Sequence, residues 1–69
     1  MSMKEVPLYE LERGQKFKLY DDGPWMQFVK LDGLYGAVTD RFVPEEELEW
    51  EKDIAWLTAT EKVYVEDED

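Results

Sequence analysis

The chain has 69 residues, enough for one small domain with a thin core, and its 18 acidic and 8 basic side chains give a formal net charge of −10. The absence of cysteine and histidine excludes disulfides and the commonest ligands of soft metals such as zinc. No run approaches the roughly 20 apolar residues of a membrane span, and the first residues lack the apolar segment of a signal peptide, so we expect a cytoplasmic protein.

The first elements along the chain are a turn and a short strand. Gly14 follows a mixed apolar and charged segment and is placed to close a turn. Residues 16–20 then alternate between polar and apolar side chains, which is the period of a half-buried strand. The Asp-Asp-Gly-Pro sequence at 21–24 predicts a second turn.

The clearest local signal is a β-hairpin over residues 25–39. Two apolar runs flank Asp32-Gly33, and a type I′ turn favours such a pair because both of its central residues have positive φ. The resulting register pairs Val29 with Gly36 and Gln27 with Val38 on one face, which we predict to be the core.

The other face of this hairpin is also apolar. It carries Met26 and Phe28, and the same register places Tyr35 there opposite Lys30. Two explanations remain open. Either the sheet curls so that both of its faces are covered, or Met26, Phe28 and Tyr35 form a self-association surface between copies of the chain.

The segment 44–53 gives two conflicting patterns. Pro44 followed by three glutamates is typical of a helix start, whereas residues 48–51 alternate as a strand does. We predict a short helical turn near 44–49 that leads into extended chain. Residues 54–59 and 63–65 then predict two further strands, and residues 66–69 predict a frayed acidic tail.

Together these elements predict a mainly β fold. One small domain over residues 1–65 would contain about five short strands with little helix. So short a sheet must close or curl to cover its core. We therefore expect a five-stranded SH3-like barrel or a curled antiparallel meander.

Two motifs resemble those of a known group of proteins. Leu11, Gly14 and Phe17 form a leucine-x-x-glycine-x-x-phenylalanine opening, and residues 29–33 read valine-lysine-leucine-aspartate-glycine. In this respect residues 11–39 are similar to short, mostly uncharacterised phage proteins. The resemblance implies a small barrel and a viral origin, and it carries no catalytic residues to this chain.

Most of the net charge lies near the C-terminal end. Residues 44–69 have a net charge of −9, against −1 for residues 1–43. Such a field repels nucleic acid and anionic membranes and attracts basic protein surfaces. The predicted partner-binding residues are the acids of this segment and the tryptophan among them. They are Glu45, Glu46, Glu47, Glu49, Trp50, Glu51 and Asp53.

These acids have three readings. If residues 47–51 are extended, Glu47, Glu49 and Glu51 share one face at intervals of about 6.6–6.8 Å, a spacing that would mimic successive phosphates of nucleic acid. The charges could instead keep a thin, aromatic-rich domain soluble. A Ca²⁺ or Mg²⁺ site would need the same oxygen ligands, but no calcium-loop pattern is present, so we predict no metal and no cofactor.

Catalysis is not expected, because no histidine base and no phosphate-binding glycine loop are present. The leading hypothesis is a non-catalytic protein that inhibits or adapts a host protein through a basic surface of that partner. Alternatively, a homo-oligomer could sequester a nucleotide signal between aromatic rings and cations such as Arg13, Lys16, Lys18 or Arg41. A virion structural or assembly role is the third alternative.

Overall fold

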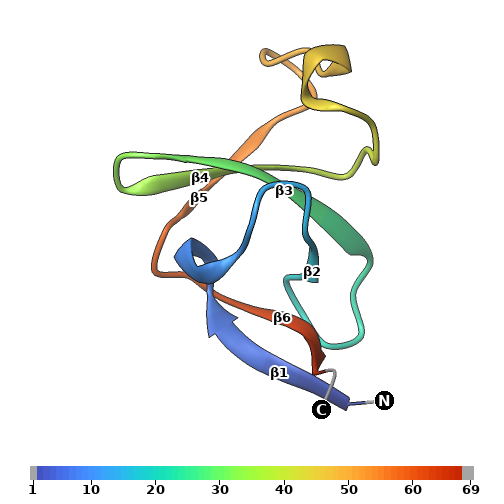
Figure 1. The fold of residues 1–69 in the computed structure, drawn as a ribbon, viewed down its shortest axis with the longest axis vertical. Coiled ribbons are helices and arrows are strands. Elements are labelled where there is room, and N and C mark those ends of the chain that lie inside the picture. Colours follow the sequence, from blue (N-terminus) through green and yellow to red (C-terminus); the bar gives the residue numbers. More distant parts are fainter. Residues whose placement is uncertain (1, 68–69) are drawn as a thin grey trace.

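The computed structural model describes residues 2–67, which form one open antiparallel sheet of six strands (Figure 1). The strands are β1 (Ser2–Pro7), β2 (Lys16–Lys18), β3 (Trp25–Asp32), β4 (Tyr35–Thr39), β5 (Ala55–Thr58) and β6 (Lys62–Asp67). Two short 3-10 helices, η1 (Leu8–Glu10) and η2 (Glu45–Glu47), complete the fold. The prediction of a mainly β fold with a helical turn near 44–49 is therefore confirmed.

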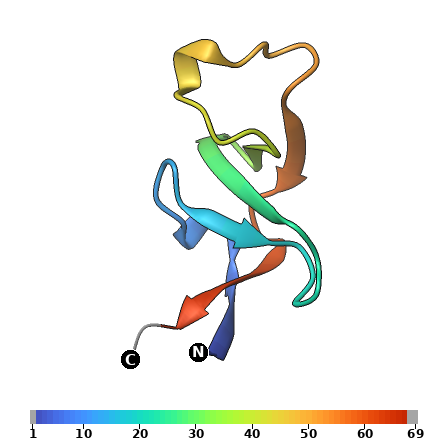
Figure 2. The same cartoon turned by 90° about the vertical axis from the view of Figure 1, so that its right-hand side faces the viewer.

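The sheet has the order β1-β6-β2-β3-β4-β5, so β6 returns to lie between β1 and β2. β1 was not predicted, and it pairs with β6 along its whole length, up to Ser2 opposite Asp67. Glu66 and Asp67 thus belong to a strand rather than to a frayed tail, and the prediction for residues 68 and 69 lies outside the described residues. β1 and β6 form one end of the molecule, and the chain between β4 and β5 forms the other (Figures 1 and 2).

The predicted hairpin forms between β3 and β4, but its predicted register is wrong. The two turn residues are Gly33 and Leu34. Gly33 has a φ of 65°, whereas every residue between 2 and 67 that is not a glycine, Asp32 included, has a negative φ. This excludes a type I′ turn on Asp32-Gly33 and fits a turn with glycine in its first position. Val29 forms a bulge between the Phe28–Val38 and Lys30–Ala37 pairs, because one extra residue must be absorbed there.

The bulge changes which side chains face the core. Phe28, which was predicted on the other face, is 2% exposed and lies in the inner core, whereas Val29, which was predicted on the core face, packs with Ala37 and Leu48 instead. The inner cluster contains Leu8, Leu11, Phe17, Phe28, Val38, Val63 and Val65. These residues come from η1, β2, β3, β4 and β6 and from the loop after η1. The sheet therefore curls around one apolar core.

Gly36 shows how tightly this core is packed. A Cβ atom at Gly36 would lie 2.5 Å from Cδ2 of Leu8 and 3.3 Å from Cε1 of Phe28. Leu8 is fully buried, so its side chain has little room to move away. The absence of a side chain on β4 is what lets η1 pack directly against the sheet.

A second, smaller cluster covers the opposite face of β3 and β4. Val29, Ala37 and Leu48 are buried there, with Val43 and Ile54 packed against them. Of the two explanations for the apolar second face, covering by the chain itself is therefore the one observed. The self-association prediction is wrong for Phe28, which is buried in the inner core, and Met26 also packs against that core. Tyr35 alone of the three is exposed.

Candidate functional site: the acidic loop and the aromatic face

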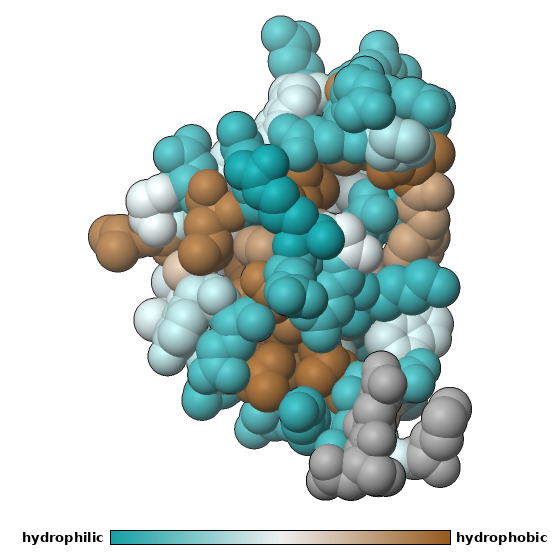
Figure 3. All heavy atoms as spheres, viewed as in Figure 1, coloured by the Kyte–Doolittle hydropathy of each residue, from teal (hydrophilic) through white to brown (hydrophobic). Residues whose placement is uncertain are grey.

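The most acidic part of the surface is the connection between β4 and β5, which we call the acidic loop (residues 40–54). It contains seven acidic and two basic side chains. Its two ends lie side by side, because Val38 pairs with Ala55. A compact surface loop with adjoining ends is an Ω-loop, a structure that frequently carries function. In Figure 3 hydrophilic side chains predominate over this end of the molecule, and most of the exposed hydrophobic patches lie further down in the view.

The loop is fixed to the sheet by an apolar contact. Leu48 is 7% exposed and packs on Val29 and Ala37. It occupies this position because η2 turns the chain after Pro44, with the Glu47 N–H donating to the Pro44 carbonyl at 2.9 Å. The alternation of residues 48–51 thus marks one buried leucine in a loop rather than a strand.

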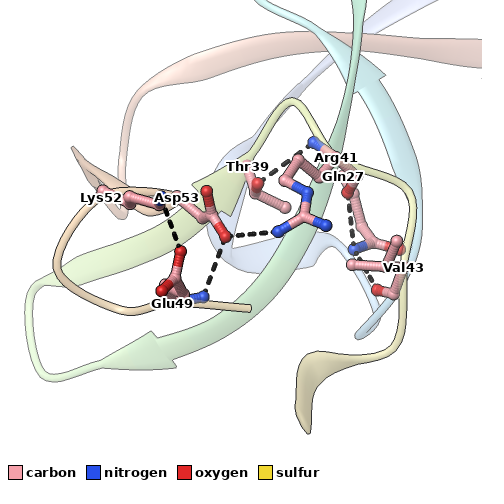
Figure 4. A network of polar contacts seen from close by, with 7 residues as sticks. All are labelled: Gln27, Thr39, Arg41, Val43, Glu49, Lys52 and Asp53. Carbon is pink, nitrogen blue, oxygen red and sulfur yellow. Dashed lines mark hydrogen bonds and ion pairs between the residues drawn. The ribbon is translucent and has the colours of Figure 1, made fainter. Parts of the chain in front are cut away.

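A partly buried carboxylate, that of Asp53, holds the second half of the loop (Figure 4). Oδ2 of Asp53 accepts from Nη1 of Arg41 at 2.6 Å and from the Glu49 N–H at 2.9 Å. The hydrogen bond from the Glu49 N–H lowers the pKa of the Asp53 carboxyl below its ordinary value of 3.8, and the hydrogen bond from Arg41 lowers it further. Asp53 is therefore ionised at neutral pH and ties the loop's start to its end.

Two polar residues of the sheet hold the first half of the loop. Nε2 of Gln27 donates to the carbonyls of Arg41 and Val43, each at 3.2 Å. Oγ1 of Thr39 accepts from the Arg41 N–H at 3.1 Å. These contacts fix the backbone on both sides of Arg41, which positions its guanidinium beside Asp53 (Figure 4). Sequence reasoning missed Gln27 and Thr39 as positioning residues.

The predicted row of acids does not form. Residues 50–53 turn rather than extend, since the carbonyl of Glu49 accepts from the N–H groups of Lys52 and Asp53. Glu47, Glu49 and Glu51 therefore do not follow one another along a strand face. The spacing proposed for mimicry of nucleic acid is wrong.

The seven predicted binding residues divide by what they already contact. Glu45 pairs with Arg13 at 3.7 Å and Glu49 with Lys52 at 2.9 Å, while the side chain of Asp53 is only 12% exposed. Within residues 2–67, Glu46, Glu47 and Glu51 are exposed and make no ion pair. The structure thus leaves these three carboxylates available to a partner.

Trp50 of the acidic loop belongs to an aromatic face that continues onto β4 and β5. Its ring centroid lies 6.1 Å from that of Trp56 on β5, and Nζ of Lys30 lies 5.0 Å from the Trp50 ring centroid. Such an approach is a cation–π interaction. Tyr35 and Trp56 are 54% and 46% exposed, and with Asp32 they line a shallow open groove. We call Tyr35, Trp50 and Trp56 the aromatic face.

The cations considered for nucleotide binding are partly engaged elsewhere. Arg41 is paired with Asp53. Nζ of Lys16 lies 5.5 Å from the Phe42 ring centroid, and Nζ of Lys18 lies 4.8 Å from that of Trp25. Lys16 and Lys18 lie on strand β2, whereas Tyr35 and Trp56 of the aromatic face lie on β4 and β5, on the opposite side of β3. The structure does not bring these lysines together with Tyr35 and Trp56.

No group of three or more acidic side chains in the described part of the chain is arranged to hold a metal ion. None of the helices formed by residues 2–67 has the length and apolar character needed to cross a membrane.

No protein-family model, curated protein sequence or solved structure gives a significant match to the chain.

Proposed function

We propose that the protein is a non-catalytic, phage-encoded binding protein that inhibits or adapts a host protein by attaching to a basic surface of that partner. The observation that carries this proposal is the concentration of charge on one fixed loop. The exposed carboxylates of Glu46, Glu47 and Glu51 lie on a loop whose backbone is held by Leu48 and Asp53.

A fixed loop favours binding over a mere solubility role. Solubility requires only net charge, which a mobile tail would supply equally well. Here a buried leucine, an ion pair and two side-chain contacts from Gln27 hold one loop conformation. Ordering a loop before binding reduces the entropy lost on association. The acidic loop therefore has the properties of a preorganised recognition element.

The test is a comparison of wild type with the variant that carries Glu46→Lys, Glu47→Lys and Glu51→Lys. Each protein would be immobilised, exposed to a bacterial host lysate at low salt, and eluted with a salt gradient. We expect wild type to retain a discrete protein that elutes as ionic strength rises, because screening weakens charge attraction. The purified partner would then be titrated against both proteins by calorimetry.

The matched control reverses three exposed acids outside the loop, on β1, between β2 and β3, and on β6, with Glu5→Lys, Asp22→Lys and Glu66→Lys. It changes the net charge by the same amount but leaves the acidic loop unaltered. We expect the control to keep most of the affinity and the loop variant to lose it. Equal losses in both variants would mean that only net charge matters, and the proposal would be wrong.

A further inference from the structure

The two edges of the sheet are protected very differently. β1 lies at one edge and carries Lys4 and Pro7, and a lysine or a proline on an edge strand discourages pairing with another chain. β5 lies at the other edge and has the sequence Ala-Trp-Leu-Thr, with no charge, no proline and no bulge. An unprotected edge strand is a place where another strand can add.

The hydrogen bonds of β5 show which backbone groups face outward. The Ala59 N–H donates to the Leu34 carbonyl. This bond shows which alternate residues of β5 form hydrogen bonds with β4. Residues 55 and 57 then bond inward to β4, while the backbone groups of Trp56 and Thr58 point away from it. The Thr58 carbonyl accepts from the Glu61 N–H. The outward groups left for a new strand are the N–H and carbonyl of Trp56 and the N–H of Thr58.

The same stretch of β5 borders the groove formed by Asp32, Tyr35 and Trp56. Asp32 pairs with Tyr35 across β3 and β4. Tyr35 is diagonal to Trp56 across β4 and β5, a separation that large rings can bridge. No lysine or arginine between residues 2 and 67 forms an ion pair with the Asp32 carboxylate. Two exposed rings and one free carboxylate therefore meet beside an open strand edge.

This combination fits the guanidinium of an arginine. A planar guanidinium stacks on aromatic rings and donates two parallel hydrogen bonds to a carboxylate. The aromatic face already makes one cation–π contact, since the Lys30 ammonium lies over the Trp50 ring. The acids of the neighbouring loop would add attraction for a basic segment and repel a second copy of this acidic chain.

We propose that β5 and this groove bind an extended, arginine-bearing segment of a protein partner. The segment would add to the sheet as a strand beside β5, through the outward groups of Trp56 and Thr58. One of its arginines would insert between Tyr35 and Trp56 and bond to Asp32. The inference rests on the proposed function in taking a basic protein as the partner, and it places the anchoring contact outside the acidic loop.

The test uses a short synthetic peptide in which valine and threonine alternate around a central arginine. Binding would be followed by amide chemical shifts of the labelled protein and by tryptophan fluorescence. We expect shift changes at residues 55–58 and at Asp32 and Tyr35. A peptide with citrulline in place of arginine keeps the shape without the charge, and we expect it to bind at least about tenfold more weakly, as loss of a charge-assisted hydrogen bond implies.

Protein variants separate the two parts of the site. Asp32→Asn should weaken the arginine peptide about tenfold and leave the citrulline peptide unaffected, whereas Asp22→Asn should change neither. Thr58→Pro removes an outward N–H without touching the β4–β5 ladder, and it should weaken both peptides. If Thr58→Pro proves unfolded by circular dichroism, a peptide methylated on its backbone nitrogens replaces it, and that peptide should not bind.

Several outcomes would overturn the inference. Peptide-induced shifts confined to residues 45–51 would show attraction by charge alone, and a homodimer that Thr58→Pro dissociates would make a second copy the occupant of β5. The proposed function fails independently, if the loop reversal at Glu46, Glu47 and Glu51 leaves the affinity for the host partner unchanged. Loss of partner binding in that variant with no effect of Asp32→Asn would retain the function and reject the groove.

Discussion

The two faces of the β3–β4 hairpin are covered in different ways. On the inner face seven buried apolar side chains, drawn from residues 8 to 65, pack into one core. On the outer face three buried side chains and a set of polar contacts hold the acidic loop. The first arrangement determines whether the chain folds, and the second determines where the loop lies. Folding and binding should therefore respond to different substitutions.

The largest effect is expected from Phe17→Ala in the inner core. Phe17 is fully buried, and truncation of a buried phenylalanine costs about 3–5 kcal/mol. Small domains have total stabilities of roughly 0.05–0.15 kcal/mol per residue, so this variant should be largely unfolded at 25 °C. Far-UV circular dichroism with urea titration measures the effect. A cooperative transition near the wild-type midpoint would show that the inner cluster does not dominate stability.

A smaller effect is expected from Leu48→Ala on the outer face. The free energy of unfolding should fall by about 2 kcal/mol. This value is at the lower end of the range for buried leucines, because a surface loop can partly collapse into the cavity that the substitution leaves. The sheet should persist while the loop loosens. Amide hydrogen exchange would show this as faster exchange at Glu49 and Asp53, with unchanged protection at Val38 and Val63. Uniform loss of protection would mean that the two clusters unfold as one unit.

The sequence predicted most strands but not the details that create the site. Alternation and breaker residues identify the chain from β2 to β6, because those signals are local. β1 has no such alternation, and it is a strand because β6 lies beside it. The bulge at Val29 is likewise decided by packing, since Phe28 pairs with Val38 in the inner cluster while Val29 packs with Ala37, the partner of Lys30, in the outer one.

Local sequence signals also could not reveal which contacts the acids of the acidic loop make. Counting charges identified the acidic segment, but charge alone did not show which of its carboxylates make ion pairs within the protein. Asp53 was grouped with its exposed neighbours, although its partner Arg41 lies twelve positions away and reaches it only because the loop closes. Asp32 was passed over because it was assigned to the turn, and the observed register places it in β3 beside Tyr35.

A still smaller and pH-dependent effect is expected from Asp53→Asn. The pKa of this carboxyl is lowered in the folded protein, so its stabilising contribution is fully present above the unfolded-state pKa. That contribution declines as the pH falls through the folded-state pKa. The difference in urea midpoint between wild type and Asp53→Asn should thus be constant near neutral pH and shrink below about pH 4. A difference that persists at pH 2 would show that the carboxylate's charge is not what holds Arg41 and Glu49.

The smallest effect on folding is expected where the effect on binding is largest. Replacing Glu46, Glu47 and Glu51 with glutamine removes three exposed charges that make no ion pair among the described residues, so the urea midpoint should stay unchanged or rise slightly as self-repulsion falls. Solubility at low salt distinguishes the two readings of these acids. If they only keep the domain soluble, the variant should precipitate more readily and bind its partner normally. If the acidic loop is a recognition element, the variant should remain soluble, because Asp and Glu elsewhere still carry a large negative charge, and its partner affinity should fall.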